Sequence, residues 1–76
     1  MKEDDYMPLS MADIGEKYII NKIRGKNETV RFIENLGFVE GAEVIVVAQI
    51  HGNIIVNVKG SRVAIGRDMA GKIIVG

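Results

Sequence analysis

The second half of the chain is a series of short Ile/Val-rich segments separated by turns. These segments occupy 44–50, 54–58, 62–65 and 72–75, and a glycine stands in each of the first two breaks. β-Branched side chains favour strands because their two branches at Cβ suit a pleated, half-buried surface. A short glycine-containing connection between two such strands forms a hairpin. The sequence therefore predicts an antiparallel meander, with hairpin loops at 51–53 and 59–61 and a brief turn at 67–70 before the last strand.

The first of these segments alternates regularly. Side chains two residues apart point to the same face of a strand. One face of the segment is therefore expected to carry Val44, Val46, Ala48 and Ile50.

An earlier strand is expected over 17–23, but its pattern is imperfect. Ile20 and Ile23 are three residues apart, so they cannot both face inward on a regular period of two. A β-bulge near Asn21 and Lys22 would reconcile them, because a bulge adds one residue to one strand.

A single helix is expected over 27–36. Asn27 is a good N-cap residue, and Glu28 stands in the first turn, where the helix dipole favours negative charge. The helical period places Phe32, Ile33 and Leu36 on one apolar face.

The helix is expected to end in a glycine motif made of Leu36, Gly37, Phe38 and Gly41. Gly37 can adopt the left-handed conformation that stops a helix, and Phe38 would then fold back onto Ile33. Gly41 can take a positive φ in the tight turn that follows.

The chain of 76 residues has room for one domain. We expect a loose lead over 1–7 and a domain over 8–76. About five short strands and one short helix fit a mainly β fold, a small SH3-like barrel, because closing an Ile/Val sheet removes its adhesive edges.

Composition excludes several classes of function. The chain has no cysteine and one histidine, His51, so a disulfide and a Cys/His zinc site are impossible, and no nucleophile–base pair can be argued. No catalytic, cofactor-binding or metal-binding residue is therefore assigned, and the chain is not expected to be an enzyme. Ten basic and ten acidic side chains cancel, which disfavours binding to nucleic acid.

Two features of the sequence indicate where in the cell the protein is located. No apolar run approaches the roughly 20 residues that span a bilayer, and the acidic start is unlike a secretory signal. We expect a cytoplasmic protein that does not insert into a membrane.

The densest basic stretch contains Lys22, Arg24 and Lys26, followed by Arg31. A solvated face is the ordinary interpretation of such a stretch, and an electrostatic docking patch is the alternative. His51 lies in a predicted hairpin loop, where it is either a solvated residue or a contact to a metal or partner. The candidate partner-binding residues are thus Lys22, Arg24, Lys26 and His51.

Taken together, these residues resemble the FeoA family. The resemblance rests on the order Leu9, Gly15, Ile20-x-x-Ile23, Arg31, Leu36-Gly37-Phe38-Val39-x-Gly41 and Val44–Val47, and on a tail with Val58-x-Gly60, Val63-Ala64-Ile65 and Met69-Ala70-x-x-Ile73-x-Val75. It implies an SH3-like accessory protein of bacterial ferrous-iron uptake that contacts the cytosolic GTPase region of the FeoB permease. Transition-metal binding is implied at the level of the family only. Two departures concern loops: the family often has a proline-flanked loop where this chain has 49–53, and an arginine where Gly66 stands.

An alternative function is regulatory. Iron-dependent transcriptional repressors end in a similar SH3-like domain, but this sequence shows no helix-turn-helix before it. The accessory function is favoured, and we expect a monomer.

Overall fold

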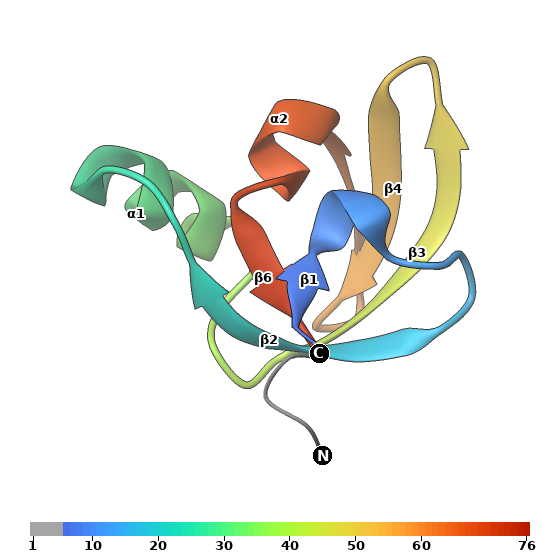
Figure 1. The fold of residues 1–76 in the computed structure, drawn as a ribbon, viewed down its shortest axis with the longest axis horizontal. Helices are drawn as coiled ribbons and strands as arrows, with labels where there is room; N and C mark the ends of the chain where they lie inside the picture. The colour runs from blue at the N-terminus through green and yellow to red at the C-terminus, as the bar shows by residue number, and fades with distance from the viewer. Residues whose placement is uncertain (1–5) are drawn as a thin grey trace.

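The computed structural model describes residues 6–76, which fold into six strands and three short helical segments (Figure 1). In chain order the elements are β1 Met7–Pro8, a 3₁₀ turn η2 Leu9–Met11, β2 Lys17–Ile23, α1 Asn27–Asn35, β3 Glu43–Ile50, β4 Asn53–Val58, β5 Ser61–Gly66, α2 Arg67–Ala70 and β6 Ile73–Val75.

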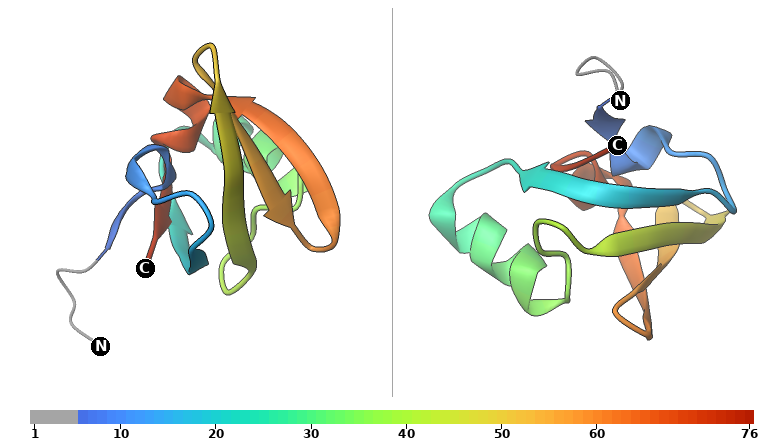
Figure 2. Two further views of the ribbon diagram at one scale, coloured as in Figure 1. Left: turned by 90° about the vertical axis from the view of Figure 1, so that its right-hand side faces the viewer. Right: turned by 90° about the horizontal axis from the view of Figure 1, so that it is seen from below.

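All six strands form one antiparallel sheet in the order β1-β6-β2-β3-β4-β5. β2 pairs with β3 through its first residues, Lys17–Ile19, and with β6 through Ile20–Ile23. Because one strand serves two neighbours in succession, the sheet curls around its own core (Figure 2). The expectation of a mainly β, SH3-like fold is confirmed, with a sixth strand that the sequence did not predict.

The inner face of the curled sheet is entirely apolar. No buried polar or charged side chain occurs in the part of the chain that the structure describes, and the largest fully buried side chain is Phe38. The buried cluster draws on every strand but β1, on both α-helices and on η2, through Leu9, Ala12, Ile20, Ile33, Phe38, Val44, Val46, Ile54, Val56, Val58, Ile65, Ala70, Ile73 and Val75.

The bulge expected in β2 is present. Ile20 pairs with Val75 and Lys22 pairs with Ile74, so Asn21 is the extra residue. Ile20 is fully buried and Ile23 packs against the core.

A second bulge, in β3, was not predicted. Val46 pairs with Val56 and Ala48 pairs with Ile55, which leaves Val47 as the extra residue. Beyond it the alternation changes phase, so Ile50 is 51% exposed. The expectation that Ala48 and Ile50 share the face of Val44 and Val46 is therefore wrong.

α1 also departs from expectation at its start and on its faces. The N-cap position is taken by Lys26 rather than Asn27, and it makes no side-chain capping hydrogen bond. Phe32 is 53% exposed, whereas Ile33 is fully buried and Leu36 packs against the core. Adjacent helical residues point about 100° apart, and a three-turn helix that touches the barrel with one narrow face buries only one of them.

The end of α1 is the predicted glycine motif. Gly37 has φ +108°, its N–H donates to the Glu34 carbonyl, and the Phe38 N–H donates to the Ile33 carbonyl. These two bonds define a Schellman motif. Gly41 has φ +88°, and its N–H donates to the Ile20 carbonyl at 2.8 Å.

The remaining turns are tighter or more ordered than predicted. The segment Arg67–Ala70 is a short helix, α2, rather than a simple turn, and it buries Ala70. The β3–β4 and β4–β5 connections are two-residue turns, with Ile50 paired to Asn53 and Val58 paired to Ser61.

Both two-residue turns have positive φ at both central residues. His51 and Gly52 have φ of 48° and 81°, and Lys59 and Gly60 have 51° and 77°. This geometry matches the type I′ turn, whose backbone twist suits the flanking strands.

The start of the chain is described only from Tyr6. Met7 already pairs with Val75 in β1, and residues 1–5 lie outside the described part. The division into a lead over 1–7 and a domain over 8–76 stays a prediction.

Replacement of Gly37 by alanine tests the helix stop. We expect Gly37→Ala to lower the free energy of unfolding by about 1–2 kcal/mol, because Cβ disfavours the left-handed conformation. The added carbon would lie 3.6 Å from Val58 Cγ1, an ordinary contact, so the cost comes from the backbone. Gly66→Ala is the matched control: Gly66 has φ −71° and open space around it, so its change should stay within about 0.5 kcal/mol. Equal urea midpoints for the two variants would contradict the prediction.

The β4–β5 turn offers a stabilising change. Lys59→Asn should raise the free energy of unfolding by roughly 0.5 kcal/mol, because asparagine tolerates positive φ better than lysine. Lys59→Val should lower it by about 1–2 kcal/mol, because a β-branched residue is strained there. Thermal melts of the two variants should move in opposite directions, and a shift of both in the same direction would be evidence against the type I′ assignment.

Candidate functional site

Two of the predicted basic residues border a surface hollow. This hollow, of about 320 Å³, lies where β1, β2 and the start of β6 meet. Its lining residues are Tyr6, Met7, Pro8, Asn21, Lys22, Arg24, Gly71 and Ile74. We call it the basic hollow.

The bulge in β2 orients the two cations. Because Asn21 is inserted between Ile20 and Lys22, the residues that follow it change face. Ile23 then points toward the core, whereas Lys22 and Arg24 are both exposed on the opposite face. Arg24 continues the ladder, since its N–H donates to the Lys72 carbonyl at 2.7 Å.

The other side of the basic hollow is apolar and aromatic. Ile74 pairs with both Lys22 and Pro8, and Tyr6 is 40% exposed. The ring of Tyr6 lies against the backbone of Gly76, so closely that a Cβ at Gly76 would be 2.5 Å from the ring. A side chain at Gly76 would therefore force the Tyr6 ring to move.

The cations of the hollow have no carboxylate partner among residues 6–76. The one ion pair recorded in that range joins Lys17 Nζ and Glu43 Oε1 at 3.8 Å. Lys22 and Arg24 thus present their charges beside the exposed Tyr6 ring and the half-buried Met7 and Pro8, an arrangement that suits an acidic partner surface.

The other two predicted partner-binding residues lie elsewhere. Lys26 is exposed directly before α1, and His51 is exposed in the β3–β4 turn. Neither lines the basic hollow. The role of all four residues in partner binding stays a prediction.

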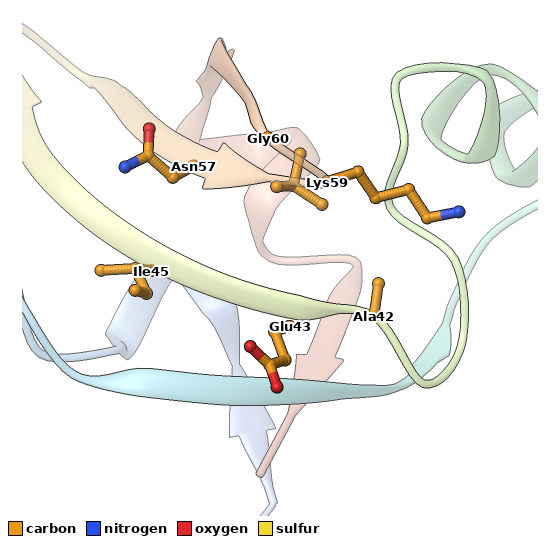
Figure 3. A pocket seen from close by; sticks show the side chains of 7 residues that line it. Ala42, Glu43, Ile45, Asn57, Lys59 and Gly60 are labelled. Carbon is orange, nitrogen blue, oxygen red and sulfur yellow. The ribbon is translucent and has the colours of Figure 1, made fainter.

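A second hollow, of about 310 Å³, lies on the outer face of β3 and β4 (Figure 3). Its lining includes one carboxylate, that of Glu43, and one ammonium group, that of Lys59. The full set of lining residues is Ala42, Glu43, Ile45, Asn57, Val58, Lys59 and Gly60. Glu43 is paired with Lys17, so the Lys59 ammonium group is the one charge of this hollow without an ion pair within residues 6–76.

No serine, threonine or histidine lines either hollow, so neither combines a serine or threonine nucleophile with a histidine base. Within residues 6–76, no three His, Cys, Asp or Glu side chains are grouped so that they could hold a metal ion. No helix in that range is long and apolar enough to cross a bilayer.

The curled six-stranded sheet with its short helices defines an SH3-like domain protein. The sequence model of the FeoA domain matches residues 7–76, nearly the whole chain. The chain belongs to the FeoA family, as its residues suggested. FeoA proteins are non-enzymatic accessory proteins, which confirms the expectation that this chain is not an enzyme.

Related proteins agree with this assignment. A Methanocaldococcus jannaschii protein is provisionally named Fe(2+) transport protein A. It is 35% identical to this chain over 68 residues, which cover 90% of this chain and 83% of that protein. A crystal structure of an iron uptake regulatory protein, FeoA, superposes with a TM-score of 0.86 and 34% identity over 93% of this chain and 95% of that one. The zinc complex of Stenotrophomonas maltophilia FeoA, described as a prokaryotic SH3 domain protein, gives a TM-score of 0.80 and 25% identity over 92% of this chain and 89% of that one.

The fold is also found in regulators. A manganese-dependent transcriptional repressor with bound manganese has a TM-score of 0.86 but 21% identity, and the similarity covers 93% of this chain and 36% of that one. At that identity the likeness concerns the fold alone.

Sequence reasoning found the cations of the hollow but missed its apolar side. Lys22 and Arg24 are visible as neighbours two residues apart. Tyr6 and Ile74 are separated by almost the whole chain and meet only through the β1–β6 pairing. The closest sequence signal is Pro8, a residue that suits an edge strand.

Deletion of Asn21 tests how the hollow is built. The deletion joins Lys22 directly to Ile20, and the regular ladder that results keeps Lys22 outward, Ile23 inward and the register with β6 unchanged. We therefore expect this deletion to change the free energy of unfolding by less than about 1 kcal/mol. Asn21→Ala keeps the bulge, is the matched control, and should change the free energy of unfolding by less than about 0.5 kcal/mol. A deletion variant that urea melts show to be more than about 2 kcal/mol less stable than Asn21→Ala would show that Asn21 is not the inserted residue.

Proposed function

We propose that this protein is a cytoplasmic accessory protein of ferrous-iron uptake that acts by contact with the cytosolic GTPase region of a FeoB-type permease. Membership of the FeoA family supports a place in the ferrous-iron uptake system. The name of the Methanocaldococcus jannaschii relative supports the same system. Action through contact is supported by the linings of the two hollows, which contain no serine or threonine nucleophile and no histidine base.

The observation that carries the proposal is the basic hollow. Lys22 and Arg24 present positive charge without a carboxylate partner in the described part of the chain, next to Tyr6, Met7 and Pro8. Charge of this kind steers association, and the adjoining apolar surface provides contact once water is displaced. A domain of this size would bury well under about 1,000 Å² on its side of the complex, so we expect a transient complex with micromolar or weaker affinity.

The regulatory alternative has less support. The repressors share the fold at 21% identity, whereas the FeoA structure is 34% identical to this chain. The overall charge of zero also disfavours DNA as the ligand. The absence of a resident metal or cofactor and the monomeric state remain expectations.

Charge reversal tests the proposal. The cytosolic region of the cognate permease is titrated with this protein in nucleotide-free, GDP and GTP-analogue states, while amide resonances are recorded. We expect Lys22→Glu and Arg24→Glu each to weaken binding at least tenfold and to reduce its dependence on salt, with an unchanged melting midpoint.

Arg31→Glu is the matched control, because Arg31 is an exposed cation on α1 outside the hollow. It should change affinity less than about threefold, since a distant exposed charge is largely screened. If no nucleotide state shifts any resonance at protein concentrations of several hundred micromolar, while a promoter fragment does, the regulatory function replaces this one.

A further inference from the structure

β5 forms one margin of the sheet. Within the described residues it pairs with β4 alone, over Ser61–Gly66, and its other side has no strand beside it. Figure 2 shows this strand, in orange, at the border of the curled sheet.

The register fixes which backbone groups point away from the sheet. Val58 and Ser61 close the two-residue β4–β5 turn, so this pair is hydrogen-bonded. Hydrogen-bonded pairs alternate along an antiparallel ladder, so Val63 and Ile65 are also hydrogen-bonded to their partners on β4. Arg62 and Ala64 therefore direct their N–H and C=O groups outward. No hydrogen bond to these four groups is recorded within residues 6–76.

The opposite margin cannot offer the same groups. β1 is two residues long, and Pro8 has no N–H to donate. Short edge strands that contain proline resist pairing with another chain. Of the two margins, β5 is the one that can accept a further strand.

The surroundings of this margin are basic. From Lys59 to Asp68 the chain carries three cations, Lys59, Arg62 and Arg67, and one carboxylate. Arg62 Nε donates to Asn57 Oδ1 at 3.2 Å, which holds the guanidinium over the outer face of β4 and β5. Its terminal N–H groups can then bind a carboxylate on a neighbouring strand.

The margin also lies close to the basic hollow. β5 ends at Gly66, α2 follows, and Gly71 after α2 lines the hollow. Four helical residues span about 6 Å. One partner can therefore occupy the hollow and reach the end of β5.

We propose that an extended acidic segment of the permease's cytosolic region adds to β5 as a seventh strand. This inference rests on the proposed function and specifies part of its contact. The segment would form backbone hydrogen bonds with Arg62 and Ala64, place a carboxylate side chain beside Arg62, and place an apolar side chain beside the half-buried Val63.

A second copy of this chain is a poorer occupant. Pairing β5 with β5 would bring two sets of Lys59, Arg62 and Arg67 together, and like charges close to each other oppose association. A single pair of six-residue strands also falls short of the roughly 800 Å² per partner of a stable interface.

Blocking the margin tests the proposal. Ala64→Pro removes one outward N–H without removing a bond to β4. Ala64→Val is the matched control that keeps the N–H. We expect Ala64→Pro to weaken binding of the permease's cytosolic region at least tenfold and Ala64→Val to change it less than about threefold, with circular dichroism confirming that both variants are folded.

Amide exchange of the unmodified protein provides an independent measurement. In the complex, exchange of the Arg62 and Ala64 amides should slow at least tenfold, because outward amides become hydrogen-bonded. Binding that slows exchange around Lys22 and Arg24 but not at Arg62 and Ala64 would overturn this inference and leave the proposed function intact. Absence of binding would overturn both. Protection that appears without the permease and grows with the concentration of this protein would identify a second copy as the occupant and overturn the proposal.

Discussion

The double pairing of β2 is the constraint on which the rest of the structure depends. One strand bonds to β3 and then to β6, and the residue inserted at Asn21 lies in the β6-paired part. The double pairing curls the sheet, so that it encloses an apolar core without a central helix. The inserted residue turns Lys22 and Arg24 outward. A regular strand that kept Ile20 buried would place Lys22 in the core and Ile23 in water at the same time.

The elements that the sequence predicts well are those set by local rules. The positions of the two hairpin turns at glycines, the helix stop at Gly37 and the bulge in β2 each follow from a few adjacent residues. The bulge in β3 escaped prediction because both faces of that segment are apolar, so a change of phase leaves no mark on the pattern. Phe32 was misplaced for a related reason, since an apolar side chain beside Ile33 does not show which of the two faces the barrel.

Of the candidate site, the sequence predicted the cations and not their neighbours. Lys22 and Arg24 lie two residues apart, and their shared exposure follows from strand geometry. Tyr6 and Ile74 lie beside them only because β1 pairs with β6. That pairing involves two residues of β1, and no sequence pattern predicts it. Lys26 was grouped with them by charge and His51 by its place in a hairpin loop, and the fold places both outside the hollow. Composition can nominate residues for a surface, but pairing across the sheet decides which of them meet.

The two halves of the sheet differ in how far the chain must travel to build them. β3, β4 and β5 are joined by two-residue turns, whereas β6 must find β2 across α1 and the whole meander. Local pairings form at lower entropic cost than distant ones, so we expect the meander to be the part that folds early and the β1–β6–β2 half to close last. Folding rates of variants in the two halves would test this order. The basic hollow would then exist only in the completed fold, so a partner that binds there selects finished molecules over partly folded ones.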